Sequence, residues 1–136
     1  MNRTLVPIAL AFVLGAAYSN VFAAEIKLTL SGSEEVPPVT TSAKGSGTVT
    51  VNDDMTISAS ITTSGITATA AHIHMAPAGQ NGGVIVPFTK TGETWSPAPG
   101  AKLTEAQFAA YKAGNLYVNV HSAANPGGEI RAQIRP

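Results

Sequence analysis

Apolar and polar residues alternate with a period of two along much of the chain. The first clear case lies between positions 25 and 31, where Ile26, Leu28 and Leu30 are separated by single polar residues. Alternation of this kind puts the apolar side chains on one face of a β-strand and the polar ones on the other. We therefore expect a half-buried strand that starts at residue 25.

The same alternation predicts two hairpins. Residues 48–51 and 55–61 are joined by Asn52-Asp53-Asp54, which favours a turn. Residues 116–121 and 129–134 alternate on either side of a second turn, at residues 125–128. The positions expected to face the core are Val49, Val51, Ile57, Ala59 and Ile61 in the first hairpin, and Leu116, Val118, Val120, Ile130, Ala132 and Ile134 in the second.

Two stretches between the hairpins also predict strands. Residues 66–75 are rich in Thr, Ala, Ile and His, and their β-branched content favours a strand over a helix. Residues 84–88 form a short apolar run after a loop rich in Gly, Pro and Asn. Residues 32–47 are rich in Ser, Thr, Pro and Gly, and Pro37-Pro38 excludes a helix there, so this segment is expected to be a loop.

One helix is expected, at residues 105–113. Thr104 and Gln107 have the spacing of a capping box, and Gly114 provides a C-terminal stop. Phe108 and Tyr111 lie on one face, where they can pack the helix against the sheets. The fold class expected is all-β, an antiparallel β-sandwich or small Greek-key barrel with one short helix.

The first 23 residues have a different character. Arg3 gives a positive start, residues 5–17 are apolar but too few to span a bilayer, and Val21 and Ala23 occupy the positions that signal peptidase reads. We expect residues 1–23 to be a signal peptide and residues 24–136 to form one domain that is exported, either periplasmic or secreted. The alternative is an uncleaved membrane anchor.

Composition narrows the partners of such a domain. The chain has 8 basic and 8 acidic residues, and Arg3 lies before residue 24, so residues 24–136 carry 7 basic against 8 acidic residues. The sequence has no basic patch of the kind that would predict a nucleic-acid partner. It also has no second apolar stretch that would predict a membrane span. Cysteine is absent, so sheet packing or a bound ion must supply the stability that disulfides often give to exported domains.

All three histidines fall in two short motifs, Ala71-His72-Ile73-His74 and Tyr117-Val118-Asn119-Val120-His121. Positions i and i+2 of a strand share a face, so His72 and His74 can converge on one ion, and His121 on a neighbouring strand would complete three nitrogen ligands. Such a set suits copper or zinc. The three nitrogens must then lie within about 3 to 4.5 Å of one another.

A metal site is not the only interpretation of these motifs. The histidines could instead form a surface pair or a hydrogen-bonding device at strand ends. Met75 and Glu129 lie close to a histidine in the sequence, and Glu129 could orient the His121 imidazole across the turn.

The remaining polar groups are expected to be solvated. Glu34-Glu35 and Asp53-Asp54 fall in predicted loops, which disfavours a glycosidase pair, and Arg131 is expected to face solvent from a sheet. No nucleophile elbow is present, and the glycine-rich turns lack the following helix of a phosphate loop.

The histidine motifs belong to longer segments that resemble the CHRD (chordin-type) domain family. These segments run from Leu30-Ser31-Gly32-Ser33-Glu34-Glu35-Val36-Pro37-Pro38, through His72-Ile73-His74 and Gly79-Gln80-Asn81-Gly82-Gly83-Val84, to Leu116-Tyr117-Val118-Asn119-Val120-His121-Ser122 and Asn125-Pro126-Gly127-Gly128-Glu129-Ile130-Arg131-Ala132-Gln133-Ile134. The resemblance covers essentially all of residues 24–136.

The resemblance implies an exported domain with a superoxide-dismutase-like or immunoglobulin-like fold. The family is named for repeats in chordin, an extracellular binder of growth factors, so an extracellular protein is a possible partner. The pattern is also similar to that of copper,zinc superoxide dismutase, and this implies His72, His74 and His121 as copper-type ligands.

The leading hypothesis is a binding module with a copper or zinc site. The alternatives are a metal-free structural or protein-interaction domain and a dismutase-like redox enzyme.

The predicted signal peptide has a direct test. Because Val21 and Ala23 set the cleavage position, the exported protein is expected to begin at Ala24. The intact mass and N-terminal sequence of the exported protein measure this. Export with residues 1–23 still attached would support the membrane anchor instead.

Overall fold

The chain is described here from a computed structural model that covers residue 15 and residues 23–136, so the predicted signal peptide lies almost entirely outside the described residues. The strands are β1 (Glu25–Leu30), β2 (Lys44–Val51), β3 (Ile57–Ser64), β4 (Ala68–Met75), β5 (Gly83–Thr91), β6 (Thr94–Pro97), β7 (Leu116–Ser122) and β8 (Ile130–Ile134). A 3-10 turn, η1 (Gly32–Glu34), follows β1, and the helix α1 (Glu105–Lys112) precedes β7. Among the described residues, no helix is long and apolar enough to cross a membrane.

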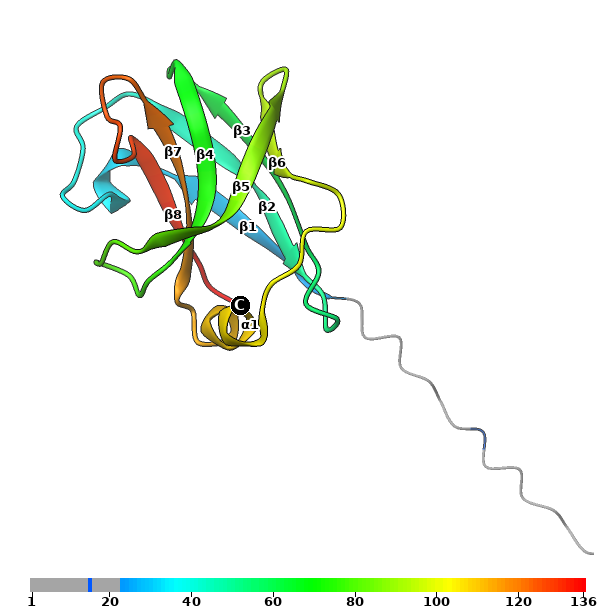
Figure 1. Ribbon diagram of the computed structural model, residues 1–136. Coiled ribbons are helices and arrows are strands. Elements are labelled where there is room, and N and C mark those ends of the chain that lie inside the picture. Colours follow the sequence, from blue (N-terminus) through cyan, green and yellow to red (C-terminus); the bar gives the residue numbers. More distant parts are fainter. Residues whose placement is uncertain (1–14, 16–22) are drawn as a thin grey trace, which may run out of the picture.

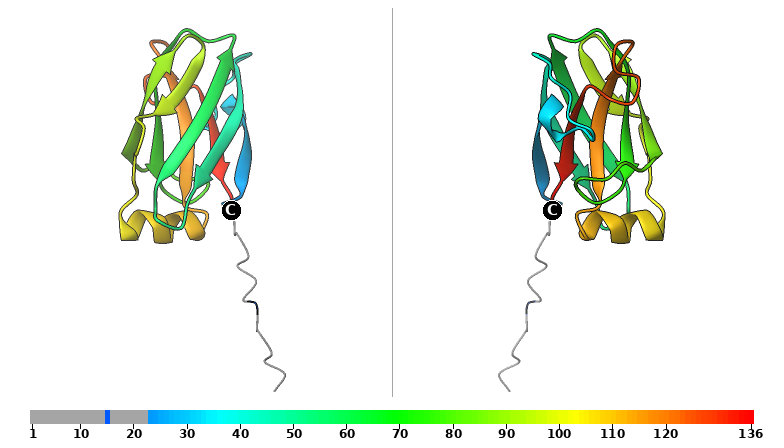
Figure 2. Two further views of the ribbon diagram at one scale, coloured as in Figure 1. Left: turned by 90° about the vertical axis from the view of Figure 1, so that its right-hand side faces the viewer. Right: turned by 90° about the vertical axis from the view of Figure 1, so that its left-hand side faces the viewer.

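The strands form one antiparallel sheet in the order β1-β2-β3-β6-β5-β4-β7-β8. The pairs β3–β6 and β4–β7 join strands that are not consecutive in the chain, which is the Greek-key arrangement. The sheet wraps around a core in two layers, with α1 across one end (Figures 1 and 2). The expected all-β fold, close to a barrel and with one short helix, is confirmed.

The two edge strands meet at one point. Ser31, directly after β1, and Arg131, in β8, exchange two backbone hydrogen bonds of 3.0 and 3.1 Å. Away from this bridge the strands separate, and a groove of about 250 Å³ between them is lined in part by Lys27 and Arg135. The bridge therefore almost closes the barrel and leaves a gap at one end.

The core follows from the alternation along the strands. In β7, the side chains of Leu116, Val118 and Val120 belong to the core cluster, whereas Tyr117 and Asn119 lie outside it on the other face. The inward positions predicted for both hairpins are confirmed as buried, except that Ala59 is only partly buried.

Two elements differ from the prediction. β2 begins at Lys44, so the predicted loop at residues 32–47 is shorter than expected, and Ser-Gly alternation hid the start of the strand. β6 was not predicted, because its four residues include a serine and a proline and show little pattern of their own. β6 is held by pairing with β5, for example between Trp95 and Lys90.

The predicted helix caps are confirmed. The backbone N–H of Gln107 donates to the Thr104 hydroxyl (3.2 Å), and the Gln107 side chain accepts from the Thr104 N–H (2.9 Å). Gly114 has a φ of 77°, the left-handed conformation of a helix stop. Tyr111 is buried in the core and stacks with Phe108, whose ring centre is 6.1 Å away, so the predicted packing of the helix is also confirmed.

A matched pair of valine substitutions tests the described core. Val49 is fully buried and Val84 is 51% exposed, although both lie in strands. Val49→Ala is expected to lower the free energy of unfolding by about 2–3 kcal/mol, because it removes apolar contacts and leaves a cavity. Val84→Ala is expected to change it by less than about 0.5 kcal/mol. Urea denaturation of both variants measures the difference, and equal effects would contradict the described core.

Candidate metal centre

Strand pairing brings the three histidines together on the outer face of the barrel. His72 and His74 lie two residues apart in β4, so their side chains share a face. β4 pairs with β7 in a register that sets His72 opposite Asn119 and Ala70 opposite His121. His121 is therefore the diagonal neighbour of His72, and the predicted approach of the two motifs is confirmed.

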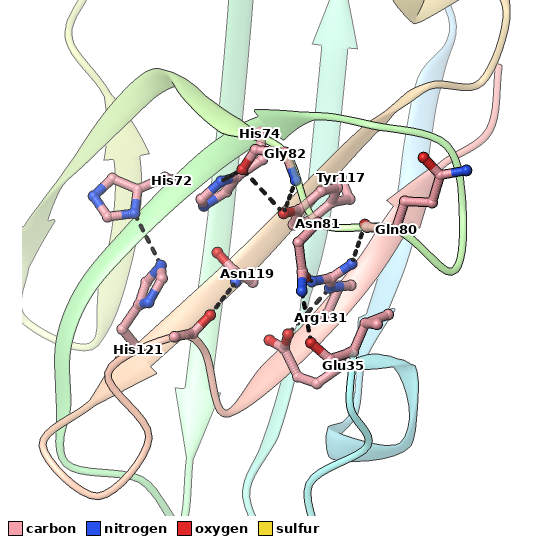
Figure 3. Close-up of polar contacts among 12 residues, drawn as sticks. Glu35, His72, His74, Gln80, Asn81, Gly82, Tyr117, Asn119, His121 and Arg131 are labelled. Atoms are coloured by element: carbon pink, nitrogen blue, oxygen red, sulfur yellow. Dashed lines mark hydrogen bonds and ion pairs between the residues drawn. The ribbon is translucent and has the colours of Figure 1, made fainter.

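The three imidazoles form a compact triangle (Figure 3). Their ring centres are 4.8 Å apart for His72 and His121, 5.5 Å for His72 and His74, and 5.8 Å for His74 and His121. One ring nitrogen from each lies within 4.8 Å of the other two. Nitrogens bound to one ion at about 2.0–2.1 Å would be about 3.3–4.1 Å apart. The largest separation is thus slightly above this range, so ion binding would require the side chains to shift toward one another.

The hydrogen bond of His74 fixes its tautomer. Its Nδ1 lies 2.9 Å from the carbonyl oxygen of Gly82, which can only accept, so Nδ1 carries the proton. In the neutral ring Nε2 then holds a lone pair. This atom is buried and has no hydrogen-bond partner among the described residues. Buried polar atoms in proteins are almost always paired, so an unpaired Nε2 calls for a functional explanation.

His121 is oriented in the same way. Its Nδ1 donates to the carbonyl oxygen of Pro126 (2.9 Å), so in the neutral ring its Nε2 holds the lone pair. That Nε2 lies 3.0 Å from Nδ1 of His72, which donates to it. Two of the three rings, those of His74 and His121, therefore use a backbone carbonyl to keep the lone pair on Nε2.

The surroundings favour neutral rings. Burial lowers the pKa of His72 most, and the nearby positive charges that His121 and His74 would carry lower it further. Burial also lowers the pKa of His74, although the hydrogen bond to Gly82 opposes this effect. Neutral imidazole is the form that binds metals, so these directions favour a metal ligand over a charged surface pair.

Tyr117 and Arg131 support His74 from the neighbouring strands β7 and β8. The Tyr117 and His74 rings stack with their centres 4.8 Å apart and their planes 4° apart. β7 lies between β4 and β8, and from β8 the Arg131 guanidinium lies 3.8 Å from the centre of the Tyr117 ring. These stacking partners were not predicted from the sequence.

The expectation that Arg131 and Glu35 are solvated was wrong. Arg131 Nε donates to Glu35 Oε2 (3.1 Å), and both side chains are only 3% exposed. The segment that ends η1 sets Glu35 against Arg131 of β8, and this tertiary contact has no signal in local composition. Burial raises the pKa of Glu35, and the Arg131 charge opposes that rise.

Glu129 does not orient a histidine. Its carboxylate accepts hydrogen bonds from Ser122 (2.7 Å), Thr41 (2.8 Å) and Asn125 (3.1 Å), so it ties the turn before β8 to the loop after η1. The carbonyl of Pro126 has the orienting role instead. Met75 is 41% exposed next to His74 in β4.

The donor set fits a metal ion that prefers nitrogen ligands. His74 and His121 each keep a lone pair on Nε2. The Nε2 of His74 is buried and unpaired, and the Nε2 of His121 accepts from His72 Nδ1. His72 is the most exposed of the three, which leaves one side of the cluster open. Imidazole nitrogens suit copper and zinc better than calcium or magnesium.

Residues 26–134 match the family model of the CHRD domain, which covers nearly the whole described chain. The predicted family resemblance is confirmed. No curated protein and no solved structure matches the chain. The resemblance to copper,zinc superoxide dismutase therefore stays a prediction from the histidine motif.

The hydrogen bonds around Glu129 predict an acid sensitivity. They lower the pKa of Glu129, and the largest effect comes from the Ser122 hydroxyl. The ionised carboxylate therefore stabilises the fold at pH values above its ordinary pKa of 4.5, and this stabilisation is lost as the pH falls through the lower pKa of the folded state. Glu129→Gln is expected to cost about 1–3 kcal/mol of unfolding free energy at pH 7, and the difference from the natural chain should shrink below pH 4.5.

Urea denaturation at pH 7 and pH 3 measures this difference. Glu93→Gln, in the exposed turn between β5 and β6, makes the same chemical change without those partners and serves as the control. A cost at Glu129 that is the same at both pH values would contradict the role given to its charge.

Proposed function

Since this chain belongs to the CHRD domain family, we propose that it is an exported binding module that holds one copper or zinc ion between His72, His74 and His121. CHRD domains are generally extracellular protein-interaction modules. This family setting and the signal peptide predicted for residues 1–23 support a periplasmic or secreted location. They also favour binding over turnover of a substrate.

The observation that carries the proposal is the unpaired Nε2 of His74. The atom is buried, its lone pair is fixed by the bond from Nδ1 to Gly82, and no donor reaches it among the described residues. The side chain of Asn119 lies next to His74, and its Oδ1 could bond to His74 only if Nε2 carried a proton. This Oδ1 is also buried and has no partner among the described residues. Two buried acceptors without a donor favour a cation at this position.

The three side chains would contribute unequally to such a site. His74 and His121 are already set to bind through Nε2. His72 Nδ1 carries the proton that bonds His121, so it must lose that proton before it can act as a ligand. Ion binding is then expected to release a proton or move it to Nε2 of His72. Three protein ligands leave a further coordination position open.

One set of contacts supports the alternative, a metal-free structural domain. His74 joins β4 to the loop that carries Gly82, His121 joins β7 to the turn that carries Pro126, and His72 bonds His121 across the strands. These bonds would stabilise loop ends without any ion. This interpretation leaves the buried Nε2 of His74 unexplained.

The proposal predicts stoichiometric copper binding. Protein treated with a chelator and then titrated with Cu²⁺ is expected to bind one ion per chain, with nitrogen hyperfine structure in the electron paramagnetic resonance spectrum. His74→Ala is expected to abolish this binding, because it removes the nitrogen that is already free. At a free ion concentration about 100 times Kd, the melting temperature should rise by on the order of 10 °C.

Thr62→Ala, an exposed position on β3 in the other layer, is the control and should bind as the natural chain does. A parallel titration with Zn²⁺ compares the two metals. Equal copper binding by the natural chain and His74→Ala would end the proposal. A melting temperature that is unchanged by either ion would favour the structural alternative.

A further inference from the structure

We propose that Tyr117 is a positioning residue that fixes the tautomer and the orientation of His74, and so sets the affinity of the site for its ion; this inference rests on the proposed function. Tyr117 acts on His74 in two ways, directly through its ring and indirectly through the contacts of its hydroxyl group with Gly82. This role follows from the contacts of β7 with β4 and with the loop between β4 and β5.

The ring contact limits the rotation of the imidazole. Tyr117 and His74 are directly opposite each other in the pairing of β7 with β4, and their rings are nearly parallel at 4.8 Å. Tyr117 is 1% exposed and cannot move aside without disturbing the sheet. Arg131 covers the Tyr117 ring from β8, and a cation on an aromatic ring is an attractive contact. The order Arg131, Tyr117, His74 therefore forms a continuous stack across three strands.

The hydroxyl contact acts through Gly82. The Gly82 N–H donates to the Tyr117 hydroxyl oxygen (3.1 Å), and the Gly82 carbonyl accepts from His74 Nδ1 (2.9 Å). The Tyr117 hydroxyl also donates to that carbonyl over a longer distance (3.5 Å). Tyr117 thus holds both polar groups of the residue whose carbonyl accepts from His74. If this segment moved, Nδ1 would lose its acceptor, and the proton could pass to Nε2 and block the ligand atom.

The loop at residues 79–83 is held tightly in this position. Arg131 donates to the Gln80 carbonyl (2.9 Å) and to the Asn81 side chain, and Asn81 donates to the Val36 carbonyl (2.8 Å). Gly82 also packs closely against the strand before it, because an added Cβ would lie 1.9 Å from the carbonyl oxygen of Met75. The acceptor for His74 is therefore placed by contacts from β7, β8 and the segment after η1 (Figure 3).

These contacts predict how the loss of the Tyr117 hydroxyl oxygen would change the affinity for copper. Tyr117→Phe keeps the stacked ring and removes the two hydrogen bonds of the hydroxyl group, one to the Gly82 N–H and a longer one to the Gly82 carbonyl. Groups that orient a metal-binding histidine typically contribute 10–100-fold to affinity, so copper affinity is expected to fall by about that factor. His74 is expected to populate both tautomers in the chelator-treated protein, in place of the single one with the proton on Nδ1.

Two measurements on the full exported domain test the inference. Copper affinity is measured by competition with a chelator of known affinity, and the His74 tautomer by ¹⁵N chemical shifts of its ring nitrogens in the chelator-treated protein. Tyr111→Phe removes the hydroxyl of another tyrosine, in α1 and away from the cluster, and should change neither measurement. Circular dichroism and the melting temperature show whether each variant is folded.

Asn81→Ala provides a second route if Tyr117→Phe does not fold. Asn81 is exposed, so its loss should leave the core intact, but it removes two of the contacts that hold the loop. The same direction of change in affinity and tautomer is expected. Unchanged affinity and a single His74 tautomer in a folded Tyr117→Phe variant would overturn the inference and leave the copper site standing. A natural chain that binds neither copper nor zinc would overturn the proposed function, and the ¹⁵N shifts would then decide the positioning role alone.

Discussion

The buried ion pair between Arg131 and Glu35 is the contact on which the outer face of the barrel depends. Arg131 bonds to Glu35 after η1 and to the loop at residues 79–83, and its backbone closes the barrel through Ser31. Taking two charges out of water costs several kcal/mol for each ion, and only further hydrogen bonds and good geometry offset that cost. Here the guanidinium donates to a carboxylate and to two acceptors in the loop, and it lies over an aromatic ring. Removal of either charge would leave the other buried and unpaired.

This constraint connects the fold to the histidine cluster. Arg131 holds the loop at residues 79–83, whose Gly82 carbonyl orients His74. The turn before β8 orients His121 in the same way, through the Pro126 carbonyl. The imidazoles are therefore oriented by backbone carbonyls, whose positions depend on the packing of loops. A cluster built in this way has ligand atoms that are oriented before an ion arrives, which reduces the ordering that binding would require.

The sequence was sufficient to predict the strands and the convergence of the histidines, because both follow from a period of two. The inward faces of β7 and β8 and the shared face of His72 and His74 needed only alternation and one pairing. The sequence was not sufficient for Glu35 and Arg131, since a charged residue in a loop or on an outer strand face is solvated unless another segment covers it. It also could not indicate which carbonyl fixes each imidazole, because Gly82 and Pro126 act through backbone atoms that every residue has.

The single bridge between Ser31 and Arg131 also affects how this domain can associate with other chains. An open sheet edge is a template onto which a foreign strand can add, and outside the cell this invites aggregation. Here β1 and β8 pair with each other at the bridge, and where they part, the gap is lined by charged side chains, among them Lys27, Glu34 and Arg135. Charged side chains at a sheet edge disfavour the addition of a further strand, including that of a second copy. A protein partner would thus have to recognise side chains and loops, not extend the sheet.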